Sequence, residues 1–130
     1  MITLNEGAVI TSFLQQLDFV DEVILVDSHS SDQTVALAKA FDHVRVFTRD
    51  FDDFSSQKNF ALDQVTHPWV LLFDPDEVIT PQAKQEILSA IQSPKAEAYF
   101  IRRQLYFMGK KIRFSGFQTD WVIRLGKTQA

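Results

Sequence analysis

The residues with the clearest chemical potential are three acids within four positions, Asp74, Asp76 and Glu77. They follow directly on an apolar run, residues 69–73, which is typical of a strand buried on both faces. Acids that follow such a strand emerge at its C-terminal end, where open α/β sheets bind ligands. Pro75 restricts the backbone between the two aspartates. Because close carboxylates repel each other and perturb each other's ionisation, the stretch predicts a bound cation, and a hard divalent ion bridging to a phosphate fits best.

The elements around this stretch are predicted to form a parallel α/β sheet. Apolar and β-branched runs predict strands at 1–4, 22–26, 44–48 and 69–73, and helical periodicity predicts helices at 8–17, 33–41, 55–65 and 80–91. This alternation is typical of parallel strands joined by right-handed crossovers. Strands without intervening helices are predicted at 99–107, 111–114 and 121–125. We expect one domain over residues 1–130, with an α/β half at 1–93 and an antiparallel ribbon at 94–130.

The predicted helices have recognisable starts and inward faces. Ser31 or Asp32 is a suitable N-cap for the second helix, Ser55 or Ser56 for the third, and Pro81 stands at the first position of the fourth. The third helix is expected to bury Phe60, Ala61, Leu62 and Val65, and the fourth Ala83, Ile87, Leu88 and Ile91.

Polar residues follow each predicted parallel strand. The four groups are Thr3, Asn5 and Glu6; Asp27, Ser28 and Asp32; Arg49 and Asp50; and Asp74, Asp76 and Glu77. Because the C-terminal ends of parallel strands share one edge of a sheet, we expect the four groups to line one crevice. Strand ends are also polar simply because loops face water, and that explanation suffices for any single group. Four acid-rich groups in succession favour a binding site.

Composition excludes several classes of function. A net charge of −4 and the lack of any Lys/Arg run longer than two residues give no electrostatic case for nucleic acid. The absence of cysteine excludes disulfides and thiolate metal sites. No apolar run approaches the roughly 20 residues that span a bilayer, and the first residues do not resemble a signal peptide. We expect a soluble protein or a soluble piece of one; strands predicted at both ends of the chain favour a piece.

Four motifs carry a family resemblance. They are Thr3-Leu4-Asn5-Glu6, Val26-Asp27-Ser28-x-Ser30-x-Asp32, Gln57-Lys58-Asn59-x-Ala61-Leu62 and Phe73-Asp74-x-Asp76-Glu77. In order and approximate spacing the chain resembles the family 2 glycosyltransferases, and most closely the branch that adds glucose or a related sugar to the lipopolysaccharide core of the bacterial cell envelope. The resemblance extends through Phe107-Met108-Gly109-Lys110 and residues 116–125. A lone Asp-x-Asp would be weak evidence, whereas four motifs in order are specific.

The resemblance implies a GT-A-like, Rossmann-like fold for nucleotide-diphospho-sugar transferases and a role for each matching residue. Thr3, Asn5 and Glu6 would line the nucleotide pocket, Asp27 would bind the base edge beside Ser28, Lys58 and Asn59 would lie near the nucleotide, Asp74 would face the ribose, and Asp76 would ligate Mg²⁺ or Mn²⁺ held by the diphosphate. Residues 1–93 would then bind the nucleotide sugar, and 94–130 would begin the acceptor side.

The implied reaction is an inverting sugar transfer from a nucleotide-diphosphate donor, a UDP-sugar by preference, to a lipopolysaccharide-core or other glycan acceptor. A divalent ion would stabilise the leaving diphosphate, and a carboxylate base would help the acceptor hydroxyl attack. Asp120 is the acid left in the C-terminal ribbon for that role, although a solvated acid at a strand start explains it as well. The family's later catalytic and acceptor-side segment would lie beyond residue 130. The location implied is cytoplasmic, with peripheral contact at the inner face of the membrane.

Three positions depart from the family pattern, and one of them is Gly126, which follows Arg124-Leu125 where an aromatic residue is common. His29 stands where the family usually has Gly, in a loop expected to need a positive φ, which His tolerates better than most residues. Gly7 stands where an acid or another polar residue is usual. The C-terminal ribbon carries basic residues that suit either a solvated face or an anionic acceptor: Arg102, Arg103, Lys110, Lys111 and Arg113.

Three other functions remain open at the level of sequence. A sugar nucleotidyltransferase would need a Gly-rich, basic loop after the first strand, which Asn5-Glu6-Gly7-Ala8 does not provide. A truncated or degenerate domain could bind nucleotide without turnover. A response-regulator-like switch is disfavoured because the chain ends in predicted strands instead of a helix.

Overall fold

The centre of the fold is β2 (Val23–Asp27), whose five residues are all buried. It lies between β1 (Ile2–Thr3) and β3 (Val44–Thr48) and pairs with both in parallel. The computed structural model describes residues 1–104, 106–107, 110–111 and 119–127, with side chains for residues 1–99 and 125–127. The apolar, β-branched run predicted as the second strand is therefore the strand on which the parallel sheet is built.

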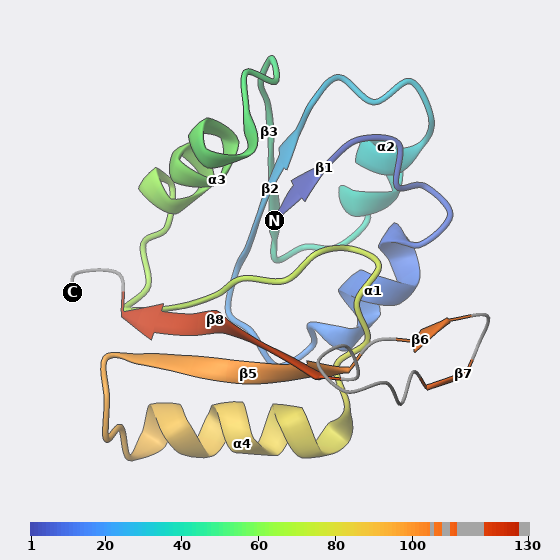
Figure 1. Cartoon of the computed structure of the whole chain (residues 1–130). Coiled ribbons are helices and arrows are strands. Elements are labelled where there is room, and N and C mark those ends of the chain that lie inside the picture. The colour runs from blue at the N-terminus through green and yellow to red at the C-terminus, as the bar shows by residue number, and fades with distance from the viewer. Residues whose placement is uncertain (105, 108–109, 112–118, 128–130) are drawn as a thin grey trace. The chain divides into compact units, whose positions relative to one another are not determined.

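Helices cover both faces of this parallel sheet (Figure 1). Because side chains alternate along a strand, Val23 and Leu25 face one way and Ile24 and Val26 the other. The first face packs on α1 (Ile10–Gln16) and α2 (Thr34–Ala38), and the buried residues there are Ile10, Phe13, Leu14, Leu17, Val23, Leu25 and Ala38. The second face packs on α3 (Phe54–Asp63) through Ile24, Val26 and Ala61. The predicted β-α alternation is confirmed for these elements.

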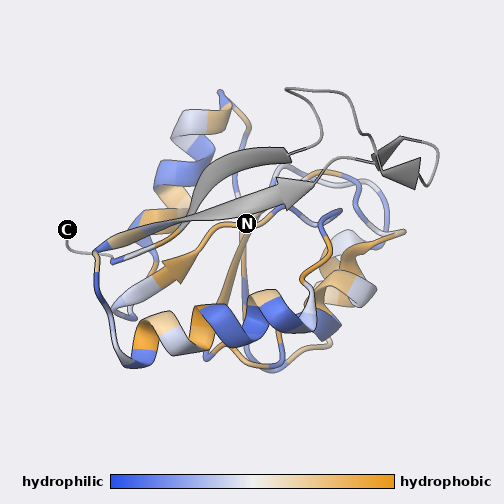
Figure 2. Cartoon of the chain, turned by 60° about the horizontal axis from the view of Figure 1, so that its bottom comes forward, coloured by the Kyte–Doolittle hydropathy of each residue, from blue (hydrophilic) through white to orange (hydrophobic). Residues whose placement is uncertain are grey.

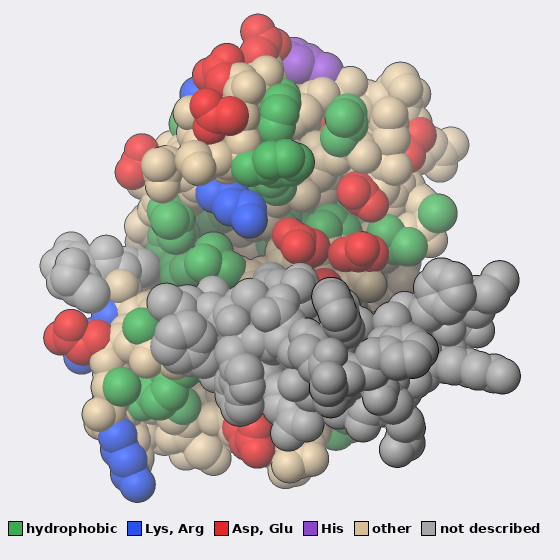
Figure 3. Space-filling view, in the orientation of Figure 1, with side chains coloured by type: hydrophobic (Ala, Val, Ile, Leu, Met, Phe, Trp, Pro, Cys, Tyr) green, Lys and Arg blue, Asp and Glu red, His purple; other side chains and the backbone are tan. Residues whose placement is uncertain are grey.

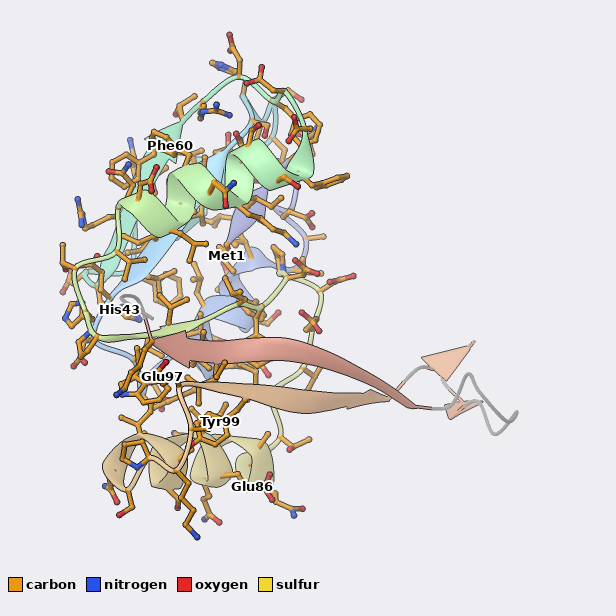
Figure 4. The ribbon with its side chains drawn as sticks, turned by 60° about the vertical axis from the view of Figure 1, so that its left-hand side comes forward. Met1, His43, Phe60, Glu86, Glu97 and Tyr99 are labelled. Carbon is orange, nitrogen blue, oxygen red and sulfur yellow. The ribbon has the colours of Figure 1, made fainter. Side chains whose placement is uncertain are left out.

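The third helix begins at a different cap from the one expected. The side chain of Asp53 caps α3 and accepts the N–H of Ser56 at 2.7 Å, so the assignment of the cap to Ser55 or Ser56 is wrong. Phe60 packs edge-on against Phe47 of β3, with ring centroids 5.8 Å apart (Figure 4). Leu62, expected to be buried, is 39% exposed. The inward face of α3 is therefore narrower than the sequence suggests.

The strand expected at residues 69–73 does not join the parallel sheet. In the structure β4 (Trp69–Leu71) pairs antiparallel with β8 (Thr119–Lys127), which also pairs with β5 (Ala98–Gln104). Its residues are half-buried, so burial on both faces is also wrong. An apolar run reports that a strand is shielded from water; it does not specify the partner or direction of its hydrogen bonds. The pairing of β4 with a strand some fifty residues later could not be read from its own residues.

The remaining elements are α4 (Pro81–Gln92), β6 (Tyr106–Phe107) and β7 (Lys110–Lys111). As expected, α4 begins at Pro81, and Thr80 Oγ1 accepts the N–H of Ala83 at 3.1 Å. Figure 2 shows polar and apolar residues side by side along α4. Ile87 is buried, as expected, but Leu88 is 37% exposed. Residues 112–114 of the predicted ribbon lie outside the described residues.

The chain divides into two compact units. Unit 1 comprises Met1–Thr66 and Phe73–Gln85, and unit 2 comprises His67–Leu72 and Glu86–Ala130. Unit 1 contains the parallel sheet, and it also contains the acids of residues 74–77. The acids that follow β4 therefore belong to the same unit as β1 and β2, although β4 itself does not.

The core of unit 1 makes a direct prediction for stability. Phe13 is 1% exposed, so we expect Phe13→Ala to lower the free energy of unfolding by about 3–5 kcal/mol, through lost burial and the cavity left behind. Val78, 81% exposed, is the matched control, and Val78→Ala should change stability by less than about 0.5 kcal/mol. Urea unfolding of the three proteins measures both. A loss at Phe13 no larger than that at Val78 would contradict the packing described for α1.

Candidate functional site

The site starts at the C-terminal ends of β1 and β2, where the strand register places Thr3 beside Asp27. Asp27 is 1% exposed, and its carboxylate accepts three hydrogen bonds. Thr3 Oγ1 donates to Oδ1 at 2.7 Å, Ser30 Oγ donates to Oδ1 at 2.6 Å, and the Ser30 N–H donates to Oδ2 at 2.8 Å. Burying a carboxylate is costly unless hydrogen bonds replace its water. Asp27 thus fixes the loop after β2 against the end of β1.

The loops after β1 and β2 are joined by Asn5. Its Oδ1 accepts the N–H of Ser31 at 2.8 Å, and its own N–H donates to Ser30 Oγ at 2.8 Å. Asn5 has a φ of 53°, a left-handed conformation that Asn adopts more readily than most residues. His29, in the partner loop, has a φ of 58°, so the expected positive φ at this position is confirmed.

A second connection between these loops runs through Thr34 and Asp32. Thr34 is fully buried; its hydroxyl accepts the N–H of Glu6 at 2.8 Å and donates to Asp32 Oδ1. Asp32 Oδ2 accepts the N–H of Gly7 at 2.9 Å, and a Cβ at Gly7 would lie 2.8 Å from that oxygen. A side chain at Gly7 would therefore displace the Asp32 carboxylate from this position. Asp32 Oδ1 also accepts the N–H of Thr34 at 2.9 Å. The N-cap of α2 is nevertheless Gln33, whose side chain makes no capping hydrogen bond, so the assignment of the cap to Ser31 or Asp32 is wrong.

The acids of residues 74–77 take different roles. Asp74 and Glu77 form a turn in which the Asp74 N–H donates to Glu77 Oε1 at 2.7 Å and the Glu77 N–H donates to Asp74 O at 3.1 Å. Pro75 is buried, Asp74 is half-buried and Asp76 is exposed at the tip. The side chain of Glu77 therefore shapes the turn, and Asp76 is the acid most open to a ligand.

Asp74 and Asp76 lie close enough to Glu6 for their charges to act on it. Burial raises the pKa of the Glu6 carboxyl, and the negative charges of Asp76, Asp32 and Asp74 raise it further. Figure 3 shows acidic side chains adjacent to one another near the middle of the view. The structure therefore brings together the acids after β1, those of the loop after β2 and those that follow β4. Acids from three of the four groups expected at one crevice therefore act on one another, although β4 is not a strand of the parallel sheet.

The loop after β3 is tied to the same region through Gln57, which is fully buried in α3. Its Nε2 donates to Ser28 Oγ at 3.0 Å, and its Oε1 accepts from Arg49 Nη1 at 2.8 Å. Arg49 also pairs with Asp52 at 3.2 Å. Gln57 belongs to a family motif, but sequence alone assigned it no role. A buried amide with both ends bonded is what links the loop after β2, the loop after β3 and α3.

Lys58 and Asn59, the next two residues of α3, are exposed. No ion pair of Lys58 occurs within the part of the chain that the structure describes. Burial lowers the pKa of the Met1 amino group to about 6, and the charges of Asp74 and Lys58 act on that group in opposite directions. Met1 lies at the start of β1 (Figure 4). Lys58 and Asp74 therefore both lie near the first strand. Lys58, which has no ion pair among the described residues, is thus a positive charge close to the acids.

Asp120 lies apart from this set in the sequence and in the division of the chain. It is a residue of β8, opposite Arg103 in the strand register, and belongs to unit 2. Its side chain is outside the described residues.

The oxygen donors at this site suit a divalent ion shared with phosphate. Among the described residues, no three His, Cys, Asp or Glu side chains lie where they could hold a metal ion by themselves. Mg²⁺ typically uses one or two carboxylates and completes its shell with water and substrate phosphates. Asp76, exposed and close to other carboxylates, fits that type of ligation.

The sequence model of the family described as glycosyl transferase family 2 matches residues 1–128, which include the four motifs and the loops just described. The chain belongs to glycosyltransferase family 2. Among curated members, the lipopolysaccharide core biosynthesis glycosyltransferase LpsC of Rhizobium meliloti is 30% identical over 115 residues, which are 84% of this chain and 42% of LpsC. The chain spans 26 to 42% of the length of several curated relatives that it matches.

Two solved structures have a fold similar to that of this chain. S. aureus TarS 1-349 gives a TM-score of 0.71 at 24% identity, over 88% of this chain and 37% of TarS. The mannosyltransferase PcManGT of Pyrobaculum calidifontis, solved with GDP-Man and Mn²⁺, gives a TM-score of 0.64 at 21% identity, over 78% of this chain and 34% of that protein. The expected GT-A-like α/β fold is confirmed. Of the helices that the structure describes, none has the length and hydropathy needed to cross a membrane.

Two neighbouring carboxylates of the site give opposite expectations for stability against pH. Because folding raises the pKa of Glu6 above 4.5, its contribution is full below pH 4.5 and is lost as the pH rises through the folded-state pKa. Hydrogen bonds from Thr34 lower the pKa of Asp32 below 3.8, so its contribution is present above pH 3.8 and is lost as the pH falls through the folded-state pKa.

We therefore expect Glu6→Gln to be more stable than the unsubstituted chain at pH 7, and Asp32→Asn to be less stable. Urea unfolding at a series of pH values measures both, and both differences should shrink as the pH approaches about 3. Differences of the same sign, or differences that do not change with pH, would show that the two carboxylates lie in other surroundings.

Proposed function

We propose that this chain forms the donor-binding part of an inverting glycosyltransferase that moves a sugar from a nucleotide-diphosphate donor, a UDP-sugar by preference, to a glycan acceptor. The observation that carries the proposal is the approach of Glu6, Asp74 and Asp76 to one another, with an exposed Lys58 that has no ion pair among the described residues. Crowded carboxylates favour a cation, and a free ammonium favours phosphate. A metal-bound nucleoside diphosphate satisfies both.

The nucleoside would bind over the ends of β1 and β2, beside Thr3 and Asn5. Asp27 Oδ1 accepts two of the hydrogen bonds given above, whereas Oδ2 accepts one, so Oδ2 keeps capacity for an N–H of the base edge. Ser28, the first residue after β2, accepts a hydrogen bond from Gln57, and Asn59 lies two residues after Gln57 in α3. Asp74, fixed by its turn with Glu77, would accept hydrogen bonds from the ribose hydroxyls.

The diphosphate would lie between Asp76 and Lys58. Asp76, with Glu6 nearby, would hold Mg²⁺ or Mn²⁺ against the phosphate oxygens, and the Lys58 ammonium would meet the remaining negative charge. The ion, when bound, supplies Lewis-acid stabilisation of the charge that develops on the departing diphosphate. The protein's part is to keep these side chains in place before the donor arrives.

The acceptor side is assigned to residues 94–130, and the nucleotide-sugar side to residues 1–93. A carboxylate base would take the proton of the acceptor hydroxyl as its oxygen attacks the anomeric carbon from the face opposite the leaving group, which inverts the configuration. Asp120 remains our candidate for that base. The similarity to LpsC supports a lipopolysaccharide-core acceptor, and that acceptor implies a cytoplasmic location with peripheral membrane contact.

Two alternatives are compared with this proposal. A domain that binds nucleotide without turnover is the first alternative; it would show the nucleotide-dependent stabilisation tested below without releasing UDP from a UDP-sugar. A sugar nucleotidyltransferase is less well supported, because residues 4–9 contain no basic residue and place Glu6 where such an enzyme would contact triphosphate.

Thermal unfolding with a panel of nucleoside diphosphates, with and without Mn²⁺, tests the donor site. At a hundred times Kd a ligand stabilises the folded state by about 2.7 kcal/mol, so UDP with Mn²⁺ should raise the Tm by several degrees. Asp76→Asn removes one charge with little change of shape and should abolish the Mn²⁺-dependent part of the increase. Asp63→Asn, the same change at an exposed position of α3, is the control and should respond like the unsubstituted chain.

The outcomes separate the possibilities. No shift with any nucleotide would overturn the donor site. Shifts that occur without Mn²⁺, and that persist in Asp76→Asn, would support nucleotide binding but remove the proposed role of Asp76. Release of UDP from a UDP-sugar by the whole chain would favour transfer over binding alone.

A further inference from the structure

The segment that carries Asp74 and Asp76 follows β4, which pairs with β8 and is not a strand of the parallel sheet. Within unit 1 it is held in another way. Gln16, the last residue of α1, lies against its backbone: Gln16 Nε2 donates to Glu77 O at 3.2 Å, and Gln16 Oε1 accepts the N–H of Ile79 at 2.7 Å. One amide therefore spans two backbone groups more than sixty residues away in the sequence.

The chemistry of this contact requires glutamine. Donating to one residue's carbonyl and accepting from the N–H two residues later is the pattern that a neighbouring strand would supply. A primary amide offers both a donor and an acceptor, whereas a carboxylate offers acceptors alone. Gln16 thus gives Glu77 O and the Ile79 N–H the pair of hydrogen bonds that a neighbouring strand would give.

The contact acts on the residue next to the proposed metal ligand. Asp76 lies at the tip of the turn between Asp74 and Glu77, and Gln16 fixes the end of that turn. Glu6 lies on the other side of the acidic site from Asp74 and Asp76, and it precedes α1, whose last residue is Gln16. The segments before and at the end of α1 therefore contact the two sides of the site. Repulsion between Glu6 and the pair Asp74 and Asp76 tends to separate these sides. Hydrogen bonds from Gln16 oppose that separation.

We propose that Gln16 is a positioning residue that holds residues 74–79 in place for the metal–diphosphate, so that it sets the affinity for the divalent ion without touching it. The inference rests on the proposed function and deepens it. Partners that orient a metal ligand commonly change metal affinity by about 10- to 100-fold when removed. Gln16 orients Asp76 indirectly, through its hydrogen bonds to the backbone of the turn.

The test compares Gln16→Met, which keeps side-chain length but removes both hydrogen bonds, with Gln15→Met. Gln15 is the exposed neighbour in α1, so the second variant makes the same substitution away from the contact. Titration calorimetry of the whole chain measures Mn²⁺ affinity at saturating UDP and, separately, uridine affinity without metal. We expect Gln16→Met to weaken Mn²⁺ binding by about tenfold and to change uridine binding less than about twofold, with Gln15→Met unchanged in both.

A second variant covers the case in which Gln16→Met does not fold. Gln16→Glu keeps an acceptor for the Ile79 N–H and loses the donor to Glu77, and it should also weaken Mn²⁺ binding while uridine binding is retained. Amide hydrogen exchange at Ile79 should accelerate in Gln16→Met and not in Gln15→Met. Unchanged Mn²⁺ affinity in both Gln16 variants, or an equal loss of uridine and Mn²⁺ binding, would overturn the positioning role alone. An unsubstituted chain that binds neither UDP nor Mn²⁺ would overturn the proposed function and this inference together.

Discussion

The proximity of carboxylates from distant segments is the constraint on which the site in unit 1 depends. Glu6, Asp74 and Asp76 come from segments far apart in the sequence, and burial, followed by the charges of Asp76, Asp32 and Asp74, disfavours ionisation of Glu6. Such an arrangement persists when the backbone around it is fixed by other contacts. Here those contacts are made by neutral side chains: Thr34 on the Glu6 N–H, and Gln16 on the backbone of residues 77 and 79. The folded state therefore stores an unfavourable charge arrangement that a bound cation would relieve.

The segments that hold the site share one feature: their buried polar side chains make hydrogen bonds to residues of other segments as well as of their own. Asp27 binds Thr3 and Ser30, and Gln57 binds Ser28 and Arg49. Unsatisfied, any of these groups would cost about 1–3 kcal/mol, so the loops after β1, β2 and β3 form as a set. A ligand at this edge of the sheet would meet a preformed surface.

Much of the fold could be predicted from the sequence because its signals are local. The apolar run of β2 and the helical periodicity of α1 and α3 follow from neighbouring residues. The left-handed conformation at His29 was expected from the family resemblance, because the family usually has Gly there. The partner of β4 could not be predicted, since an apolar run does not encode the direction of its neighbour. The roles of Gln16 and Gln57 could likewise not be predicted, because each depends on contacts with residues outside its own helix. Asp27, Asp74 and Asp76 were found because acids after a strand are a local signal, while their separate roles are implied by the family resemblance and belong to the proposed function.

The pKa of the Glu6 carboxyl, measured by ¹³C NMR, tests most directly whether the crowded acids form a cation site. In the free chain we expect a pKa above 4.5, because burial and the charges of Asp76, Asp32 and Asp74 disfavour ionisation. With Mg²⁺ and UDP bound together we expect that pKa to fall, since a nearby cation favours the carboxylate. A pKa that begins at or below 4.5, or that does not respond to Mg²⁺ and UDP, would contradict a metal–diphosphate site at these residues.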